Sequence, residues 1–116
     1  MPNEPTVEQH FDGKSPHVRE IYDRILAACG EFGYIAEDPK KTSIHLNRNS
    51  AFAGVKTQVN SVVLTVKSTE DIPSERVGNR LQASARRWYC YVKVSSPAEV
   101  DAELLGWLRN SYELSA

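Results

Sequence analysis

Apolar and polar residues alternate along residues 40–67, and this pattern predicts β-strands. Ile44 and Leu46 stand between polar neighbours, and Val62 and Leu64 repeat the same spacing further along the chain. A period of two places alternate side chains on opposite faces of a strand. We therefore expect a sheet with one buried face and one polar face that carries lysine, arginine, histidine and threonine side chains.

Turn residues divide the chain into short strands that follow one another as a meander. Pro39 cannot donate a hydrogen bond to a strand ladder, Asn49-Ser50 is typical of a tight turn, and residues 58–60 indicate another turn. The predicted antiparallel strands are residues 34–38, 42–48, 51–57, 61–67 and 88–94.

Two helices are predicted to flank these strands, and both begin at a Ser-Pro pair. Ser15-Pro16 offers a capping serine and a proline at the first helical position, and Gly30 and Gly33 mark the end of this helix. Ser96-Pro97 is followed by Glu99, which completes a capping box. The predicted apolar stripes are Val18, Ile21, Tyr22, Ile25, Leu26 and Cys29 in the first helix, and Val100, Leu104, Trp107, Leu108 and Tyr112 in the second.

The stretch 68–87 shows no clear period and is predicted to be irregular. A helical turn could form at residues 74–81, although Gly78 opposes a long helix there. Loops of this length are often functional or mobile.

Together these elements predict an α+β fold, with an antiparallel sheet of about five strands and the N- and C-terminal helices packed on one face. We expect residues 1–14 to be a flexible N-terminal lead-in, from which Phe11 could dock on the body. Residues 15–116 are expected to form a single α+β domain. The composition, with 41% hydrophobic and 25% charged residues, is that of a folded chain.

The remaining bulk features indicate a cytoplasmic protein. No apolar run is long enough to span a bilayer, and the acidic N-terminal residues lack the apolar core of a signal peptide. Cys29 and Cys90 stand in apolar patterns, so we expect buried free thiols. We expect the protein to be a monomer or a weak dimer.

Charge is distributed unevenly, although the net charge of the chain is only −1. Residues 40–93 hold ten basic and three acidic side chains, a net charge of +7. The flanking segments are acidic, with a net charge of −5 over residues 1–39 and −3 over residues 94–116. This asymmetry indicates that the middle of the chain could contact an anionic partner.

Motifs of catalysis and cofactor binding are missing from the sequence. There is no GxGxxG, Walker-type loop, CxxC, HExxH or GxSxG motif. The histidines His10, His17 and His45 have no metal-ligand spacing, and the adjacent carboxylates Glu37 and Asp38 would point to opposite faces of a strand. We therefore expect a protein that is not an enzyme, with no catalytic residues, no metal site and no cofactor.

The first group of candidate binding residues consists of Lys40, Lys41, His45 and Arg48. A lysine supplies a compact positive charge for an anion, and Thr42 between them supplies a hydroxyl donor. The alternative is a solvated sheet edge on which the lysines prevent pairing with another edge.

The second group consists of Arg76, Arg80, Arg86 and Arg87, with Tyr89 and Tyr91 nearby in the sequence. Arginine suits contact with phosphate, and an interleaved tyrosine suits stacking on a base. The alternative is an exposed loop that is kept soluble by its charge.

Several segments resemble a bacterial family catalogued as domain of unknown function 5655. The matching segments are FDGKSPHVREIYDRI, Pro39-Lys40-Lys41-Thr42 with the strand after it, Ala51-Phe52-Ala53, and SSPAEVDAELLGWLRNSYEL. The resemblance covers nearly the whole chain after about residue 11. It implies a domain that occurs alone or attached to other uncharacterised modules, and it implies no particular activity.

The second half is also similar, more distantly, to the MmcQ/YjbR-type domains. The similar segments are Arg86-Arg87-Trp88 with the following strand, and Ser111-Tyr112-Glu113-Leu114. The asparagine–lysine–lysine run of those domains is replaced by Ser84-Ala85-Arg86-Arg87. This similarity implies a small α+β sheet with helices on one side and a suggested role in DNA binding.

Three functions remain open from the sequence. The first is a binding module for nucleic acid, DNA or RNA, or another polyanion, through a basic sheet face. The second is an interaction or accessory domain that acts with a protein partner through an exposed sheet edge. Small-molecule binding ranks third, and we expect no membrane partner.

Overall fold

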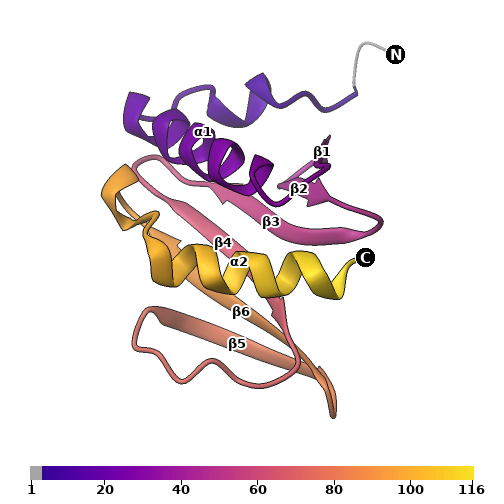
Figure 1. The fold of residues 1–116 in the computed structure, drawn as a ribbon. Helices are drawn as coiled ribbons and strands as arrows, with labels where there is room; N and C mark the ends of the chain where they lie inside the picture. Colours follow the sequence, from indigo (N-terminus) through magenta and orange to yellow (C-terminus); the bar gives the residue numbers. More distant parts are fainter. Residues whose placement is uncertain (1–3) are drawn as a thin grey trace.

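Two helices and six antiparallel strands make up the sheet and its cover within residues 4–116, which are the residues that the structure describes (Figure 1). The structure is a computed structural model, and the first three residues of the predicted lead-in lie outside the described range. Helices α1 (Pro16–Gly30) and α2 (Ala102–Leu114) cover the same face of the sheet. The predicted α+β class, with both helices on one face, is therefore confirmed.

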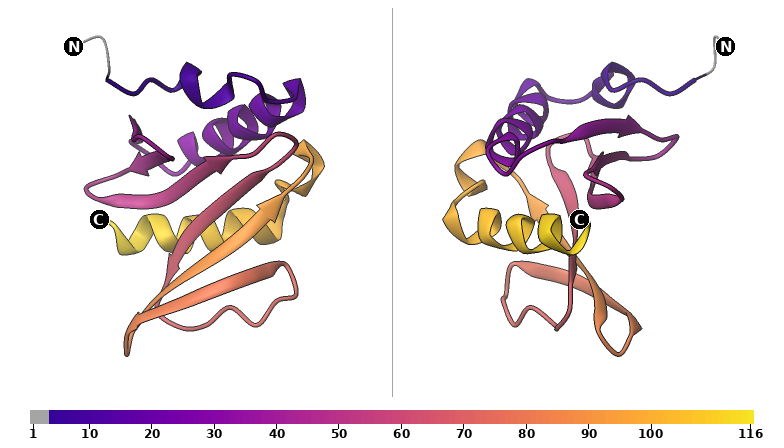
Figure 2. Two further views of the ribbon diagram at one scale, coloured as in Figure 1. Left: turned by 180° about the vertical axis from the view of Figure 1, so that it is seen from behind. Right: turned by 45° about the vertical axis from the view of Figure 1, so that its right-hand side comes forward.

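The strands lie in the order β1-β2-β3-β4-β6-β5, and every neighbouring pair is antiparallel. Their bounds are β1 (Ala36–Pro39), β2 (Ile44–Asn47), β3 (Ala51–Thr57), β4 (Val62–Ser68), β5 (Val77–Ser84) and β6 (Arg87–Val94). The meander is interrupted after β4, because the chain passes to the far edge to form β5 and returns as β6 between β5 and β4 (Figure 2).

The prediction that residues 68–87 are irregular, with a possible helical turn at 74–81, is wrong for residues 77–84, which form the edge strand β5. In this strand Val77 is buried, and every later residue is exposed. An exposed strand lacks the alternation of apolar and polar residues by which a strand is recognised. Hydrogen bonds from β6 supply the order that the local sequence does not specify.

Helix α1 begins at Pro16 as predicted and ends at Gly30, the first of the two glycines predicted to mark its end. The predicted stripe is buried against the sheet, with Leu26 half-buried at its margin. The predicted serine cap is not formed. Ser15 instead donates its hydroxyl hydrogen bond to the side-chain oxygen of Asn60, in the turn between β3 and β4. Proline at the first helical position needs no partner for a backbone N–H, so the helix still starts there.

Helix α2 starts later than the capping box predicted. The segment Pro97–Glu99 forms only a 3-10 turn, and Val100 then leaves the helical region and is buried. Asp101 is the cap of α2, since its carboxylate accepts a hydrogen bond from the backbone N–H of Leu104 at 3.1 Å. Burial of Val100 thus moves the start of the helix away from Ser96.

The hydrophobic core lies between the helices and the covered face of the sheet. Its largest fully buried side chains are Tyr22, Phe52, Ile21, Ile25, Ile44, Leu46, Leu64, Leu104, Leu108, Val18, Val55 and Val62. Both cysteines are buried and unbridged, as predicted, and burial raises the pKa of the Cys29 thiol to about 12.

Residues Glu8–Phe11 form a 3-10 helix that packs beside α1 and β3. The ring of Phe11 lies 5.3 Å from that of Tyr22, measured between centroids. The Nε2 atom of His10 lies 2.8 Å from the backbone oxygen of Lys40. Phe11 therefore docks on the body as the sequence analysis anticipated. Across residues 4–116, no helix combines the length and the apolar character needed to cross a bilayer.

Candidate functional site

The candidate site lies on the open face, which is the face of the sheet opposite α1 and α2 (Figure 2, left). One row of directly opposed residues crosses four strands of this face. His45 on β2 pairs with Gly54 on β3, Gly54 with Thr65 on β4, and Thr65 with Tyr91 on β6. Directly opposed residues share one face of an antiparallel sheet, so these side chains lie side by side.

Two further rows extend the open face on either side of the first. Lys56 on β3 opposes Val63 on β4, and Val63 opposes Lys93 on β6. On the other side, Lys67 on β4 opposes Tyr89 on β6. Lysine and tyrosine side chains thus surround the central row.

A hollow of about 310 Å³ lies over the centre of this face. Its lining residues are Thr42, Ser43, His45, Ala51, Phe52, Ala53, Gly54, Lys56, Val63, Thr65, Val66, Lys67, Tyr89 and Tyr91. Gly54 leaves the middle of the central row without a side chain. A Cβ atom there would lie 3.6 Å from the Cβ of Thr65, which is an ordinary van der Waals contact. The missing side chain at residue 54 therefore leaves room in the floor of the hollow.

A β-bulge in β3 interrupts the regular pairing of this strand beside the hollow. Pairing of β2 with β3 shifts between Leu46 and Asn47, and Phe52 is the extra residue. The backbone N–H of Lys67 donates to the Ser111 hydroxyl at 2.9 Å, and that hydroxyl donates to the backbone oxygen of Phe52. A side chain of α2 thus replaces the direct bond that an antiparallel ladder would make next between β3 and β4.

Lys67 and Arg87 form a pair of cations at this end of the hollow. Burial, followed by the charge of the nearby Arg87, lowers the pKa of Lys67. Among residues 4–116, the buried Nε of Arg87 has no hydrogen-bond partner. The amine of Lys67 lies 3.3 Å from the hydroxyl of Ser50 and has no acidic partner in the described chain. An unpaired buried donor is costly, and these two cations have no acidic partner among the described residues, so positive charge gathers at this end of the hollow.

Acidic side chains are nearly missing from the open face. Asp38 on β1 opposes His45 and is the one acidic residue in the rows of this face that the described strands supply. Its carboxylate accepts from Lys40, at 3.0 Å, and from Asn47, at 3.3 Å. These two bonds hold the pKa of Asp38 below its usual value. The carboxylate is thus engaged at the outer edge and leaves the hollow cationic.

The structure brings part of the predicted residue set to this face. His45 and Tyr89 line the hollow, and Arg87 lies beside Lys67. Lys40 and Lys41 occupy the turn between β1 and β2, next to Thr42 and Ser43 at the rim.

Other predicted residues point elsewhere. Arg48 donates to the backbone oxygen of Tyr112 on α2 at 3.2 Å, and its guanidinium carbon lies 4.3 Å from the centroid of the Tyr112 ring. Arg80 is paired with Asp71, with 2.6 Å between Nε and Oδ1. Arg86 is exposed in the turn between β5 and β6.

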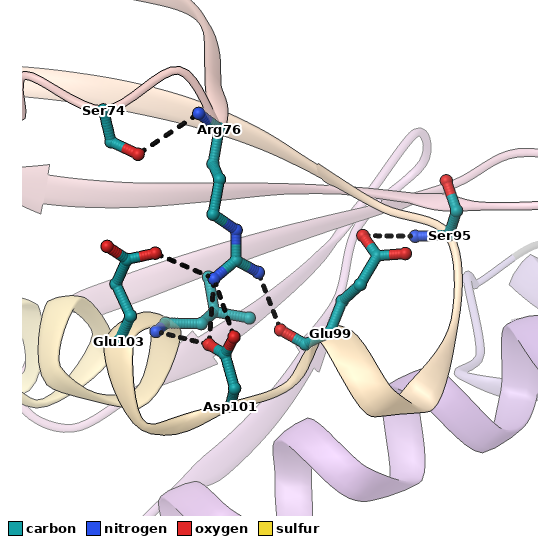
Figure 3. A network of polar contacts seen from close by, with 7 residues as sticks. Ser74, Arg76, Ser95, Glu99, Asp101 and Glu103 are labelled. Atoms are coloured by element: carbon teal, nitrogen blue, oxygen red, sulfur yellow. Dashed lines mark hydrogen bonds and ion pairs between the residues drawn. The ribbon is translucent and has the colours of Figure 1, made fainter.

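Arg76, in the same basic stretch, makes more polar contacts with acidic residues than Arg80 does (Figure 3). One guanidinium nitrogen lies 2.9 Å and 3.1 Å from the two carboxylate oxygens of Asp101 and 3.1 Å from Glu103. The other terminal nitrogen donates to the backbone oxygen of Glu99 at 2.7 Å. The bond to Asp101 is the main reason why the pKa of Arg76 is raised. This arginine ties the connection between β4 and β5 to the start of α2.

Sequence reasoning missed Lys56, Thr65 and Lys67 as lining residues, and it missed Gly54 as the floor. The alternation within each strand could have identified them, because each directly neighbours a buried residue of its own strand and therefore lies on the opposite face. Phase identifies the face of each residue, whereas the register between strands decides which of them become neighbours.

The fold and the open face define the class of this protein: a small α+β domain with a helix-covered sheet whose other face carries a cationic hollow. The chain belongs to the family described as Domain of unknown function (DUF5655), whose model matches residues 7–115. No curated protein and no solved structure matched the chain.

Proposed function

We propose that this protein is a non-enzymatic binding module that holds nucleic acid on the open face of its sheet. The observation that carries the proposal is the hollow bordered by His45, Lys56 and Lys67, with Tyr89 and Tyr91 in its wall. Cations next to aromatic rings are the combination that contacts phosphates and bases together.

The distribution of acidic residues supports the same function. On the helix side, Arg76 and Arg80 are neutralised by Asp101, Glu103 and Asp71. On the open face, Lys67 and Arg87 carry no such partner among the described residues. A polyanion gains most from cations that the protein itself has not neutralised.

The resemblance to MmcQ/YjbR-type domains points in the same direction, because DNA binding has been suggested for those domains. The matched family adds no activity of its own to this argument.

The direct test is titration of a labelled nucleic acid of about 12 nucleotides at about 50 mM and about 200 mM salt. We expect binding that weakens steeply as the salt concentration rises, because phosphate contacts release condensed counterions. The double variant Lys67→Gln and Arg87→Gln should weaken binding and flatten the salt dependence.

Arg109→Gln is the matched control, since it removes one charge from α2, where Arg109 is exposed and only loosely paired with Glu113 at 3.8 Å. It should bind as the unmodified protein does. Failure of the unmodified protein to bind any nucleic acid at low salt would refute the proposed function.

A second candidate function, addition of a partner's strand to β5, is favoured by one observation. β5 pairs with β6 on one side only, and its residues from Gly78 to Ser84 are exposed. Unpaired strand edges can accept a strand from another protein. Light scattering of mixtures with the products of neighbouring genes tests this function, and Leu81→Lys should abolish any complex that uses the edge.

A further inference from the structure

The shape and chemistry of the hollow say more about which form of nucleic acid it would accept. At about 310 Å³ it lies at the lower end of the volumes of ligand pockets, roughly 300–1,000 Å³. It is a local depression over Gly54 and Thr65, with side chains on its sides. Such a space suits one small planar group.

The sides of the hollow suit a ring. Tyr89 and Tyr91 come from β6, on one side of Gly54, and His45 comes from β2, on the other side. All three are partly exposed, so their rings remain available for stacking. Thr65 and Ser43 supply hydroxyl groups that can bond the edge of a base.

One end of the hollow suits a phosphate. Lys67 lines it directly, and Arg87 lies two positions before Tyr89 on the same face of β6. The buried Nε of Arg87 has no partner among the described residues, and the two cations repel each other. A phosphate beside Lys67 would relieve this repulsion and accept a charge-assisted hydrogen bond from the lysine amine.

We propose that the hollow accepts one unpaired nucleotide, with its base against Tyr89 and Tyr91 and its phosphate at Lys67 and Arg87, so that nucleic acid is bound as a single strand. This inference rests on the proposed function and narrows it. A duplex keeps its bases stacked inside and presents phosphates outside, so it reaches the rim cations and leaves the hollow empty.

The test compares four probes at low salt by fluorescence anisotropy or by competition. They are a labelled single strand, its duplex, an abasic strand of equal length, and a mononucleotide as competitor. We expect the single strand to bind at least about tenfold more tightly than the duplex or the abasic strand, because each stacked base contributes affinity. Displacement by the mononucleotide distinguishes a site for a free nucleotide from one that needs the strand.

Two variants locate the effect. Gly54→Val fills the hollow with a residue that strands favour, and its Cβ meets no backbone atom closely. It should remove the preference for the single strand and leave duplex binding and the salt dependence as they are. Tyr91→Leu removes an aromatic wall without filling the hollow and should reduce the preference in the same way, which keeps the test valid if Gly54→Val fails to fold.

Lys93→Gln is the matched comparison on the open face, since Lys93 is exposed and does not line the hollow. It should weaken single-strand and duplex binding equally. Equal affinity for single strand, duplex and abasic strand would overturn the inference while leaving the proposed function standing. The absence of any binding at low salt would overturn both.

Discussion

The cations on the two sides of the sheet differ in what surrounds them. On the helix side, Arg76 is held by two carboxylates and a backbone oxygen at the start of α2 (Figure 3). On the open face, Lys67 and Arg87 lie close together, and neither has an acidic partner within residues 4–116.

This difference teaches that the number of basic residues in a segment does not measure its capacity to bind an anion. Residues 40–93 carry a net charge of +7, but Arg76 fastens a loop to the start of α2, and Arg80 pairs with Asp71 of the same loop. The cations that remain for a ligand are those whose strand phase turns them away from the acidic helices. The predictions below test this division, from the largest expected effect to the smallest.

The largest effect is expected from Leu64→Ala, on the covered side of β4. Leu64 is fully buried, so the substitution should lower the free energy of unfolding by about 2–5 kcal/mol. Its neighbour Val63 faces the opposite side, and Val63→Thr should change the stability by less than about 1 kcal/mol. Urea denaturation of both variants measures their free energies of unfolding. Similar losses of stability in the two variants would show that the two faces do not differ in burial.

Ser111→Ala should lower the free energy of unfolding by about 1–3 kcal/mol, because the Ser111 hydroxyl links strands β3 and β4. The substitution leaves the N–H of Lys67 and the backbone oxygen of Phe52 without their shared hydroxyl partner. Thermal denaturation measures the loss. Ser115→Ala, which removes a hydroxyl that bonds backbone oxygens at 3.2 Å and 3.4 Å, is the comparison and should cost less. An unchanged melting temperature for Ser111→Ala would contradict the bridging role.

Arg76→Gln should lower the stability by about 1 kcal/mol, because a partly exposed network of ion pairs is screened by water. Its effect should depend on pH. The pKa of Asp101 is lowered, first by Arg76, so the stabilisation is present above the unfolded pKa of aspartate, about 3.9, and is lost as the pH falls through the folded pKa. Denaturation at neutral and acidic pH should show wild type and variant converging in acid, and a constant difference would contradict this.

Lys67→Met should give the smallest change in stability, and its pH dependence should appear at alkaline pH, whereas that of Arg76→Gln appears in acid. The folded pKa of Lys67 is lowered, so between that value and the unfolded pKa, about 10.4, the unfolded state binds more protons than the folded state. This lysine therefore makes stability rise with pH in that window, and the rise should be missing in the variant. Added polyphosphate should raise the pKa of Lys67 when it is followed by NMR, and a pKa that does not respond would argue against anion binding at this end of the hollow.

Much of the fold could be predicted because its signals are local. The stripe of α1, the bounds of β3 at Ala51–Thr57 and the alternation in β6 all follow from periods of 3.6 and 2. Strand β5 could not be predicted in this way, since its exposed residues have no period and its order comes from pairing with β6. The start of α2 was misplaced because burial of Val100 outweighs the local capping signal.

The candidate site was predictable only in part. His45 and Tyr89 were identified from their chemistry, and both line the hollow. Lys56 and Lys67 were overlooked because nothing in their own neighbourhood shows that the strand registers bring them to the same hollow as His45. Arg80 was placed with them, whereas its position on β5 opposes the buried Cys90 and turns it towards the helix side.

By itself, the sequence determined the helix stripes, the alternation of the strands and the concentration of positive charge in residues 40–93, since each is a property of neighbouring residues. The tertiary structure alone decided which cations Asp71, Asp101 and Glu103 neutralise and which surround the hollow over Gly54. The physical reason is that these contacts join segments far apart in the chain. Their distances depend on strand order, on register and on the hydroxyl of Ser111 between two strands, and no local pattern encodes them.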